Sequence, residues 1–563
     1  MRSKPVYVAG AGVASPFGDD FESVWRALIS PPELRRYSLY AGGRQRPVLA
    51  HITDVPQYEA DAEEYFVALC RRALEGLLAQ CSIDLGKRGC FLLGTGMGAS
   101  DFYLSGGQPH AYWEQSLLRR VTRGLLEGLP AEWTANACCA GAQAVAYGCD
   151  LVRLGEMDYV IAGGAEAFSY LTWAGFERLG AIDPQGCKPF DHRRRGISVG
   201  EGAAFFLLCA HRPPVPLACL LGYGATSDAY HMVAPAPGGD AMRRAMEQAL
   251  RRSGLHPGLI DAVIAHGTGT IRNDAEEGGV LHGLLGKTRV TAPKGALGHT
   301  GGASGPFSLL TAIGCLRHQT LPAIARTVRP EQELKVRPAT RTVSMRLRYL
   351  LVNCFAFGGS NLSMVCAAPE QAAYGGLEAG RRPFGEKKMR HAPAGIRRSS
   401  FSLPWPDLPI PPTGAAGRTM DPLCMRILTL AEELLKNGLD WTGRYDVGAV
   451  LSVEGGMKYT LSQCADILRT GEPKQLNPSR FPYVMLSTAL SCLTQRLGLH
   501  GPSSVFVERE SDGAMRYART LIRSHQCAAV LCVCLREGRL LRADIFETEE
   551  KPKKGDGNEG CAH

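Results

Sequence analysis

The sequence predicts an α/β fold with largely parallel sheets, followed by a second, shorter α/β unit. Short apolar runs, most of them ending in or near glycine, alternate with helical segments from Pro5 to Ala368. This pattern stops at a basic stretch rich in proline and glycine, and it returns after Asp421. A chain of 563 residues has room for two or more such units.

The expected strands of the first unit are apolar runs that lead into glycine-containing loops. They lie at residues 6–12, 90–96, 159–166, 203–210, 262–270 and 349–359. Helical segments are expected between them, for example at 62–78 and 241–252. We divide the chain into residues 1–212, 213–370, a linker at 371–420, a further unit at 421–546 and a disordered tail at 547–563.

An internal echo links the two units. The segment ACCAGAQAVAYGCDLVRLGEMDYVIAGG has a counterpart in VERESDGAMRYARTLIRSHQCAAVLCVC. In this register Tyr147 falls on Tyr517, and Cys138 falls on Glu508. The later unit is therefore predicted to be an incomplete copy of the first that has no thiol at the position of Cys138.

Composition narrows the class of protein. No apolar run reaches the roughly 20 residues of a membrane span, and the N-terminus lacks the apolar block of a signal peptide, so we expect a cytoplasmic protein. The 19 cysteines lack zinc spacing and are expected to be mostly buried thiols, with no metal site. The net charge is +9, and Arg and Lys cluster in the linker between Arg381 and Arg398 rather than on a folded face, which disfavours nucleic-acid binding. A modest positive excess also suits an acidic carrier-protein partner.

The first motif that carries chemistry is Ala137–Gly141, ACCAG, before an amphipathic helix. A cysteine at a strand-to-helix turn lies near free backbone N–H groups, and the helix dipole favours its thiolate, which lowers the pKa of the thiol. Cys138 and Cys139 are the two choices for such a nucleophile. A pair of buried structural cysteines is the alternative interpretation.

Two further motifs place histidines in glycine-rich loops. His266 ends an apolar run and begins HGTGT, while His299 lies in KGALGHTGGASG, five residues after Lys294. Ligands bind where strands end in such folds, so both histidines are candidates for one site. Loops that pack closely and cap backbone groups are the alternative, and the second loop does not match GxxxxGK[ST].

A fourth motif, NCFAFGGSN at 353–361, sets two aromatic residues against two glycines. It predicts a movable loop that presents backbone N–H groups, or else a hairpin turn that packs its phenylalanines. The opening VAGAGVAS resembles a dinucleotide-binding loop, but it lacks the third glycine and Pro16 follows at once, so we do not expect such binding.

These motifs, in this order, resemble the β-ketoacyl-acyl-carrier-protein synthases of the thiolase superfamily, especially the elongating type. The resemblance covers about Val6 to Ala367 and is carried by VAGAGVASPFG, NACCAGAQA, GGAEAF, KPFD, GEGAAFFLL, SDAYHM, HGTGT, KGALGHTGGASG and NCFAFGGSN. It implies a thiolase-like fold in αβαβα layers, built from two pseudo-repeated halves, with an extra incomplete ketosynthase-like unit at 421–546.

By this resemblance Cys138 matches the nucleophile, since the use of Cys139 would break the register to the glycine that follows. His266 and His299 match the two catalytic histidines, and Lys294 matches the lysine before the second of them. Two histidines, rather than histidine and asparagine, fit the elongating branch.

The resemblance also implies supporting residues. Asp274 and Glu277 match acidic residues that organise the site, and Thr268 and Thr270 match positions that hold the pantetheine arm. Phe357 matches a gating phenylalanine whose N–H group, with that of the nucleophile, forms the oxyanion hole. No cofactor is implied, because the substrates are carried on the phosphopantetheine of an acyl carrier protein.

The implied function is decarboxylative condensation of an acyl group with a malonyl carrier in a specialised type II polyketide or fatty-acid-like pathway. Housekeeping fatty acid elongation, a non-catalytic scaffold like a chain-length factor, and decarboxylation without condensation are the alternatives. Family habit suggests a homodimer or a heterodimer with another ketosynthase-like subunit.

Two features of this chain bear on its partners. The stretch 58–64, where family members often carry a basic helix for carrier docking, is acidic here, so docking is expected to use another face, such as Arg193, Arg194 and Arg195. The segment between Gly98 and Ala135 is shortened. We expect the unit at 421–546 to be a non-catalytic docking or dimerisation unit, because an orphan half would expose apolar surface.

Overall fold

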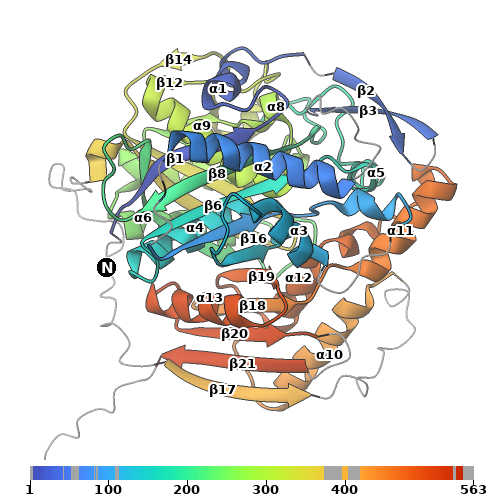
Figure 1. Ribbon diagram of the computed structural model, residues 1–563. Coiled ribbons are helices and arrows are strands. Elements are labelled where there is room, and N and C mark those ends of the chain that lie inside the picture. Colours follow the sequence, from blue (N-terminus) through green and yellow to red (C-terminus); the bar gives the residue numbers. More distant parts are fainter. Residues whose placement is uncertain are drawn as a thin grey trace, which may run out of the picture.

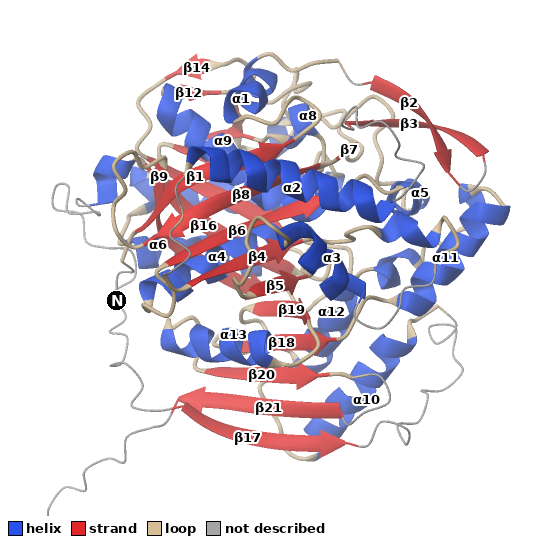
Figure 2. Cartoon of the chain, viewed as in Figure 1, coloured by secondary structure: helices blue, strands red, loops and turns tan. Residues whose placement is uncertain are grey.

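A mixed sheet of 16 strands with helices on both faces forms the centre of the computed structural model (Figures 1 and 2). The strands, in sheet order, are β13 (Arg337–Pro338), β11 (Arg289–Thr291), β10 (Ala262–Ile264), β15 (Tyr349–Phe355), β16 (Ser360–Ala367), β9 (Ala218–Ser227), β1 (Val6–Ala14), β8 (Gly202–Cys209), β6 (Tyr159–Glu166), β4 (Gly89–Gly94), β5 (Ala131–Thr134), β19 (Ser503–Val507), β18 (Val447–Val453), β20 (Ala529–Cys534), β21 (Leu541–Thr548) and β17 (Ile396–Leu403). The structure describes residues 4–33, 35–41, 44–51, 62–81, 83, 87–107, 113–372, 396–403, 419–536 and 541–548.

The helices cover this sheet in layers. They are α1 (Phe21–Ile29), α2 (Ala62–Gln80), α3 (Trp113–Thr122), α4 (Ala140–Arg153), α5 (Tyr170–Arg178), α6 (Asp240–Ser253), α7 (Ile271–Leu285), α8 (Lys294–Leu297), α9 (Ser304–His318), α10 (Pro422–Lys436), α11 (Lys458–Thr470), α12 (Leu486–Leu497) and α13 (Asp512–Arg523). Helix α4 packs on β4 and β6, α9 packs on β15, and the two helices pack on each other. Helices α4 and α9 also contact strands from both halves of the sheet, so they lie between these halves. With α2 outside β1 and β8, and α6 outside β9 and β16, the elements stack in five layers, αβαβα, as the resemblance implied.

The directions of the strands differ from the sequence prediction. Strands β4, β5 and β6 are mutually parallel, as are β10, β11 and β15. However, β1, β8, β9 and β16 pair antiparallel with their neighbours, so the sheet is mixed rather than largely parallel. An apolar run that is buried on both faces looks the same in either direction, which explains the error.

The strands of the C-terminal part continue the same sheet beyond β5, and Figure 1 shows them in orange and red below the first part. Read outward from the contact between β5 and β19, the order is β5-β4-β6-β8-β1 on one side and β19-β18-β20-β21-β17 on the other. On each side the first three strands run parallel to one another, and each of the last two strands pairs antiparallel with the strand before it. The two sides are thus related by a pseudo-two-fold axis through the β5–β19 contact.

This contact, called the seam from here on, joins backbone and side chains. Phe506 of β19 pairs antiparallel with the last residue of β5. The amide of Asn136 donates to the Ser503 carbonyl at 2.7 Å and accepts from the Val505 N–H group at 2.8 Å. Tyr147 of α4 and Tyr517 of α13, which the internal echo aligned, meet edge to face with ring centroids 4.8 Å apart.

Part of the expected linker is a strand. Residues 396–403 lie within the range 371–420, yet they form β17 and pair with β21 over their whole length. Most of the rest of that range, together with the tail after residue 548 and the acidic positions 58–61, lies outside the described residues. Among the helices that the structure describes, none is both long enough and apolar enough to cross a membrane.

Candidate active site

Cys138 lies at the turn from β5 into α4, at the start of a helix whose residues are almost all buried. The preceding Ala137 has a φ of 45°, in the left-handed region that an L-residue rarely adopts, so the backbone turns sharply there. A Cβ on Gly141 would lie 2.6 Å from the Gly302 carbonyl oxygen, which explains the glycine one turn later. The Cys138 thiol therefore lies at the N-terminal end of α4, next to the place where α4 packs closely against the segment before α9.

Cys139 points away from this site. Its thiol donates to the carbonyl oxygens of Cys354 at 3.1 Å and Ser360 at 3.3 Å, inside the core between α4 and the β15–β16 pair. The Cys354 thiol in turn donates to the Cys138 carbonyl at 3.0 Å. Of the two adjacent cysteines, only Cys138 therefore has its sulfur free to face a cavity.

A cavity of about 350 Å³ brings the sequence-predicted residues together. Its walls include Cys138, His266, Thr268, Thr270, His299 and Phe357. A smaller cavity of about 40 Å³ also borders Cys138, and most of the residues that line it are apolar. In the described part of the chain, no three His, Cys, Asp or Glu side chains are grouped so as to hold a metal ion.

The thiol of Cys138 is protonated at rest. Burial raises its pKa to about 12, and the neighbouring Cys354 adds to this, while Lys294 and the backbone N–H group of Phe357 act in the opposite direction. The sequence led us to expect a lowered pKa from the helix dipole. Desolvation outweighs the dipole here because the side chain is only 9% exposed.

Lys294 determines how His266 presents its ring. The buried ammonium group donates to the His266 carbonyl at 2.7 Å and lies 3.2 Å from His266 Nδ1. An ammonium group can only donate, so Nδ1 accepts and Nε2 carries the proton. Burial and the charge of Lys294 lower the pKa of His266 far below its usual value, so the imidazole is neutral.

His299 is held in the same tautomer by a different donor. The Gly301 N–H group donates to His299 Nδ1 at 3.1 Å, so here too Nε2 carries the proton. Burial, with a contribution from Lys294, lowers the pKa of His299 to about 3. The rings of His266 and His299 lie 5.9 Å apart, nearly perpendicular. The cavity therefore has two neutral N–H donors beside one thiol.

Two buried carboxylates hold the HGTGT loop from the first turns of α7. Glu277 accepts the backbone N–H groups of His266 and Gly267, both at 2.8 Å. Asp274 accepts that of Thr268 at 3.0 Å and that of Phe190 at 2.7 Å. Both carboxylates hold this loop through its backbone N–H groups.

Thr268 and Thr270 lie above these carboxylates. Their hydroxyl oxygens are 2.8 Å apart, and both side chains line the larger cavity. This places two adjoining hydroxyl groups where a polar chain entering the cavity would pass.

Phe357 lies in the turn between β15 and β16. Gly358 and Gly359 follow with φ of 91° and 79°, which a residue with a Cβ would adopt only under strain. The Phe357 ring centroid is 5.6 Å from that of Phe176, which is 5.3 Å from Phe481 of the C-terminal part. Phe357, which lines the larger cavity, is thus connected through Phe176 to the C-terminal part.

One residue of the site was not predicted as such. Glu166 ends β6 inside the GGAE motif, and its carboxylate accepts the N–H groups of Gly96, Met97 and Gly302 at 2.6–2.8 Å. It lines the smaller cavity beside Cys138. A charged residue at the end of a wholly apolar strand was the signal that could have revealed it.

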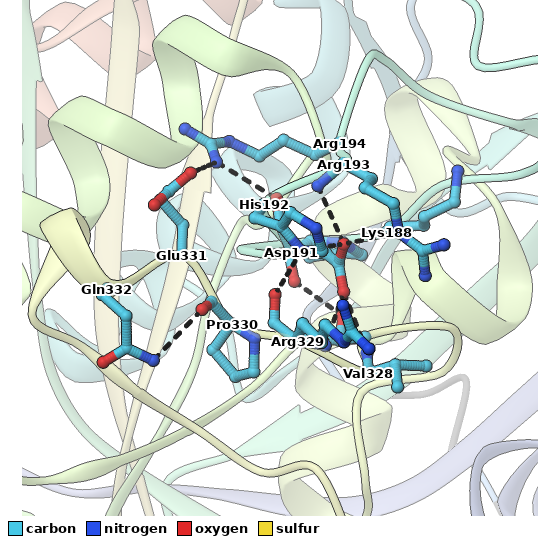
Figure 3. Close-up of polar contacts among 12 residues, drawn as sticks. Lys188, Asp191, His192, Arg193, Arg194, Val328, Arg329, Pro330, Glu331 and Gln332 are labelled. Carbon is cyan, nitrogen blue, oxygen red and sulfur yellow. Dashed lines mark hydrogen bonds and ion pairs between the residues drawn. The ribbon is translucent and has the colours of Figure 1, made fainter.

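The three arginines proposed for carrier docking have separate environments, and Figure 3 shows two of them, Arg193 and Arg194, beside Asp191. Asp191 accepts the backbone N–H groups of Arg193, Val328 and Arg329, each at 2.9 Å. The buried Arg194 donates to the Asp191 carbonyl and lies 3.8 Å from Glu331. Arg193 is exposed, while Arg195 is exposed and lines the larger cavity. Arg194 is therefore unsuited to docking.

Comparisons with known proteins agree with this geometry. The family model of the β-ketoacyl synthase N-terminal domain matches residues 130–213, and that of the C-terminal domain matches residues 217–327. The 3-oxoacyl-[acyl-carrier-protein] synthase 2 of Mycobacterium bovis is 38% identical over 246 residues, or 41% of this chain. The match spans 59% of that relative's own length.

Two further matches extend over more of the chain. A putative mitochondrial 3-oxoacyl-[acyl-carrier-protein] synthase of Schizosaccharomyces pombe is 28% identical over 420 residues. The match includes 64% of this chain and 98% of that relative. The solved structure titled "PfaC Keto synthase-Chain length factor" shares the fold over 98% of this chain and 79% of its own, with a TM-score of 0.75 and 14% identity. Residues 130–327 are thus similar to the two domains of the β-ketoacyl synthases, and the similarity to 3-oxoacyl-[acyl-carrier-protein] synthases extends over 64% of the chain.

Proposed function

We propose that this chain condenses an acyl group, held on Cys138, with a malonyl group carried by an acyl carrier protein. The observation that carries the proposal is that one cavity holds a thiol and two neutral imidazoles with their Nε2–H groups free to donate. Such donors stabilise an enolate without supplying a proton to it. The substrates bring their own phosphopantetheine arm, and Thr268 and Thr270 hold it.

The reaction begins with thioester exchange. The sulfur of Cys138 forms a bond to the acyl carbon, the bond to the pantetheine sulfur breaks, and the proton of the cysteine thiol passes to the departing sulfur. The Phe357 and Cys138 N–H groups bind the oxyanion of the tetrahedral intermediate. The thiol remains protonated until attack because its pKa is about 12.

Condensation follows when a malonyl thioester replaces the first arm. Its carboxylate leaves as CO₂, and the electron pair becomes an enolate whose oxygen accepts from His266 and His299. The enolate carbon attacks the acyl group on Cys138, which releases the cysteine sulfur as a thiolate. The thiolate then takes up a proton from solvent, which the high pKa of this thiol favours, so the site returns to its resting state.

The C-terminal part contributes to this site. Met485 lines the small cavity beside Cys138, together with Phe176 and Met97. Glu508 occupies the position that the echo aligns with Cys138, and it accepts the Gly513 and Ala514 N–H groups rather than facing a substrate. We infer a non-catalytic partner half, similar to a chain-length factor, that serves a specialised pathway rather than housekeeping elongation.

This inference also concerns assembly. Strand β19 of the same chain pairs with β5, so that edge is already occupied without a second subunit. The chain then supplies its own ketosynthase-like partner, and the external partner is an acyl carrier protein with an acidic surface. Further association into dimers would use another face.

Intact-protein mass spectrometry tests the proposal after mixing with an acyl-carrier thioester or with cerulenin. We expect a covalent adduct on the wild type and on the matched control Cys139→Ala, and none on Cys138→Ala. An adduct that persists in Cys138→Ala would refute the assignment. No adduct on the wild type would favour the scaffold, and CO₂ release without a condensed product would favour decarboxylation alone.

A further inference from the structure

Two arginines line the open part of the larger cavity. Cys138, His266 and His299 form its buried part, whereas Arg195 and Arg272 are exposed. Among the described residues neither arginine forms an ion pair or a hydrogen bond, unlike Arg194 nearby. The cavity thus leads from two unpaired cations at the surface to the thiol.

The surroundings of these arginines add to the positive potential. Helix α7 begins at Ile271, and its N-cap, Thr270, makes no side-chain capping hydrogen bond. Ile271 and Asn273 of that first turn also line the cavity, and the N–H groups of the turn carry the positive end of the helix dipole. Asp228 is a carboxylate on this wall, but it already accepts from Asn361 at 2.7 Å and from the Ala236 N–H group at 3.1 Å.

We propose that Arg195 and Arg272 bind the phosphate group of the phosphopantetheine arm whose sulfur reaches Cys138. The inference rests on the proposed function and names the substrate group held at the outer end of the cavity. A guanidinium group presents a planar fork of donors that matches two phosphate oxygens. The same phosphate occurs in a carrier-bound arm and in coenzyme A, so both sources share this chemistry.

The first experiment does not need catalysis. Pantetheine and 4′-phosphopantetheine are compared as protectors of Cys138 against alkylation by iodoacetamide. In the wild type we expect the phosphorylated compound to protect at about tenfold lower concentration. This preference should fall about threefold or more in Arg195→Gln and Arg272→Gln, and disappear in the double variant. The matched control Arg329→Gln, an exposed arginine that does not line the cavity, should keep it.

The second experiment uses acyl thioesters of pantetheine, phosphopantetheine, coenzyme A and a carrier protein as donors to Cys138. The two variants should lose kcat/KM with every phosphorylated donor and keep it with acyl-pantetheine, and the wild-type rates tell which source is preferred. A loss confined to the carrier protein would overturn the inference, since the arginines would then contact the carrier surface. Equal protection by the two free compounds in the wild type would overturn it as well.

The two proposals fail in different ways. If no thioester acylates Cys138 but phosphopantetheine still protects it through the arginines, the condensing function is wrong and the phosphate site stands. If acylation proceeds without any preference for the phosphate group, the phosphate site is wrong and the function stands.

Discussion

Each cavity histidine has one ring nitrogen occupied by a donor that belongs to the fold. For His266 this donor is the Lys294 ammonium group, and for His299 it is a backbone N–H group. Because neither donor can accept a hydrogen bond, Nδ1 of each ring must be the acceptor, and the ring proton is on Nε2. Both imidazoles therefore offer an Nε2–H group to the cavity. Lys294 therefore acts as a positioning residue, through its charge and through its hydrogen bond.

Replacement of this lysine tests the idea. In Lys294→Met we expect malonyl decarboxylation to fall about a hundredfold, the usual weight of one positioned group. The charge of Lys294 lowers the pKa of His266, so its removal raises that pKa and lets imidazolium form at a higher pH. The variant should lose activity on acidification where the wild type does not. CO₂ release from pH 5 to 8 measures this, and superimposable pH profiles would contradict it.

Met485 is the second residue with a testable role. It is 5% exposed and lines the small cavity next to Cys138 from the C-terminal part. In Met485→Ala we expect Cys138 to accept acyl chains longer by two or more carbons, since the truncation opens this cavity. The longest acyl group retained on Cys138, read by intact mass, measures the effect. Met515→Ala on α13 is the control, and an unchanged chain-length limit in Met485→Ala would exclude the role.

At the scale of elements, glycines in two helices predict opposite results. A Cβ on Gly279 of α7 would meet no atom within 4 Å, so Gly279→Ala should raise stability by about 0.5–1 kcal/mol through helix propensity. A Cβ on Gly141 of α4 would meet Gly302 and Pro306 at 2.6 Å. Gly141→Ala should therefore lower stability by about 1–3 kcal/mol. Thermal midpoints compare them, and a stable Gly141→Ala would show that α4 and α9 can separate without cost.

The elements could be predicted from the sequence better than their directions. Alternating apolar runs and 3.6-residue periodicity located β6, α2 and α6, because both patterns are local. Strand β17 was missed since IRRSSFSL, with its two adjacent arginines, does not look like a buried strand. Its partner β21 lies more than 130 residues later, so only tertiary pairing reveals it. The site motifs were found because glycine and histidine mark them, but Glu166 depends on contacts between three distant loops.

Helix α13 shows how the second part is adapted to its position. In the equivalent helix α4, all residues from Ala140 to Val152 are buried. In α13 the buried positions face β18, β20 and β21, while Arg519 and Arg523 are exposed. The sequence led us to expect that this unit packs on another surface, and on this helix the outward positions carry charged residues.

At the scale of the whole molecule, the seam contains a buried carboxylate whose charge opposes folding. Burial raises the pKa of Glu132 to about 7, and Glu508 adds to this, although Arg516 donates to it at 2.5 Å and acts in the opposite direction. In an unfolded chain the pKa of a glutamate is about 4.3. Because the folded pKa is the higher one, the stability that this group contributes is present below about pH 4 and is lost as the pH rises to about 7.

The variant Glu132→Gln tests this. Its carboxamide does not ionise, so its thermal midpoint should rise relative to that of the wild type between pH 5 and 8, by an amount that corresponds to about 4 kcal/mol at most. Glu127→Gln, at an exposed carboxylate away from the seam, is the matched control and should follow the wild type. Parallel curves for Glu132→Gln and the wild type would show that Arg516 keeps the carboxylate ionised throughout.

The pairing of β19 with β5 also changes what dilution can do to this molecule. In an assembly of two separate chains, the wall beside the thiol would exist only while the subunits stay bound, and it would be lost at low concentration. Here both strands belong to one polypeptide, so the two parts of the chain that form the seam meet at an effective concentration on the order of millimolar. This effective concentration does not depend on the amount of protein in solution. A weakened seam would open and close within a single molecule instead of releasing a subunit, and the chain length selected should be the same in a dilute cell as in a concentrated one.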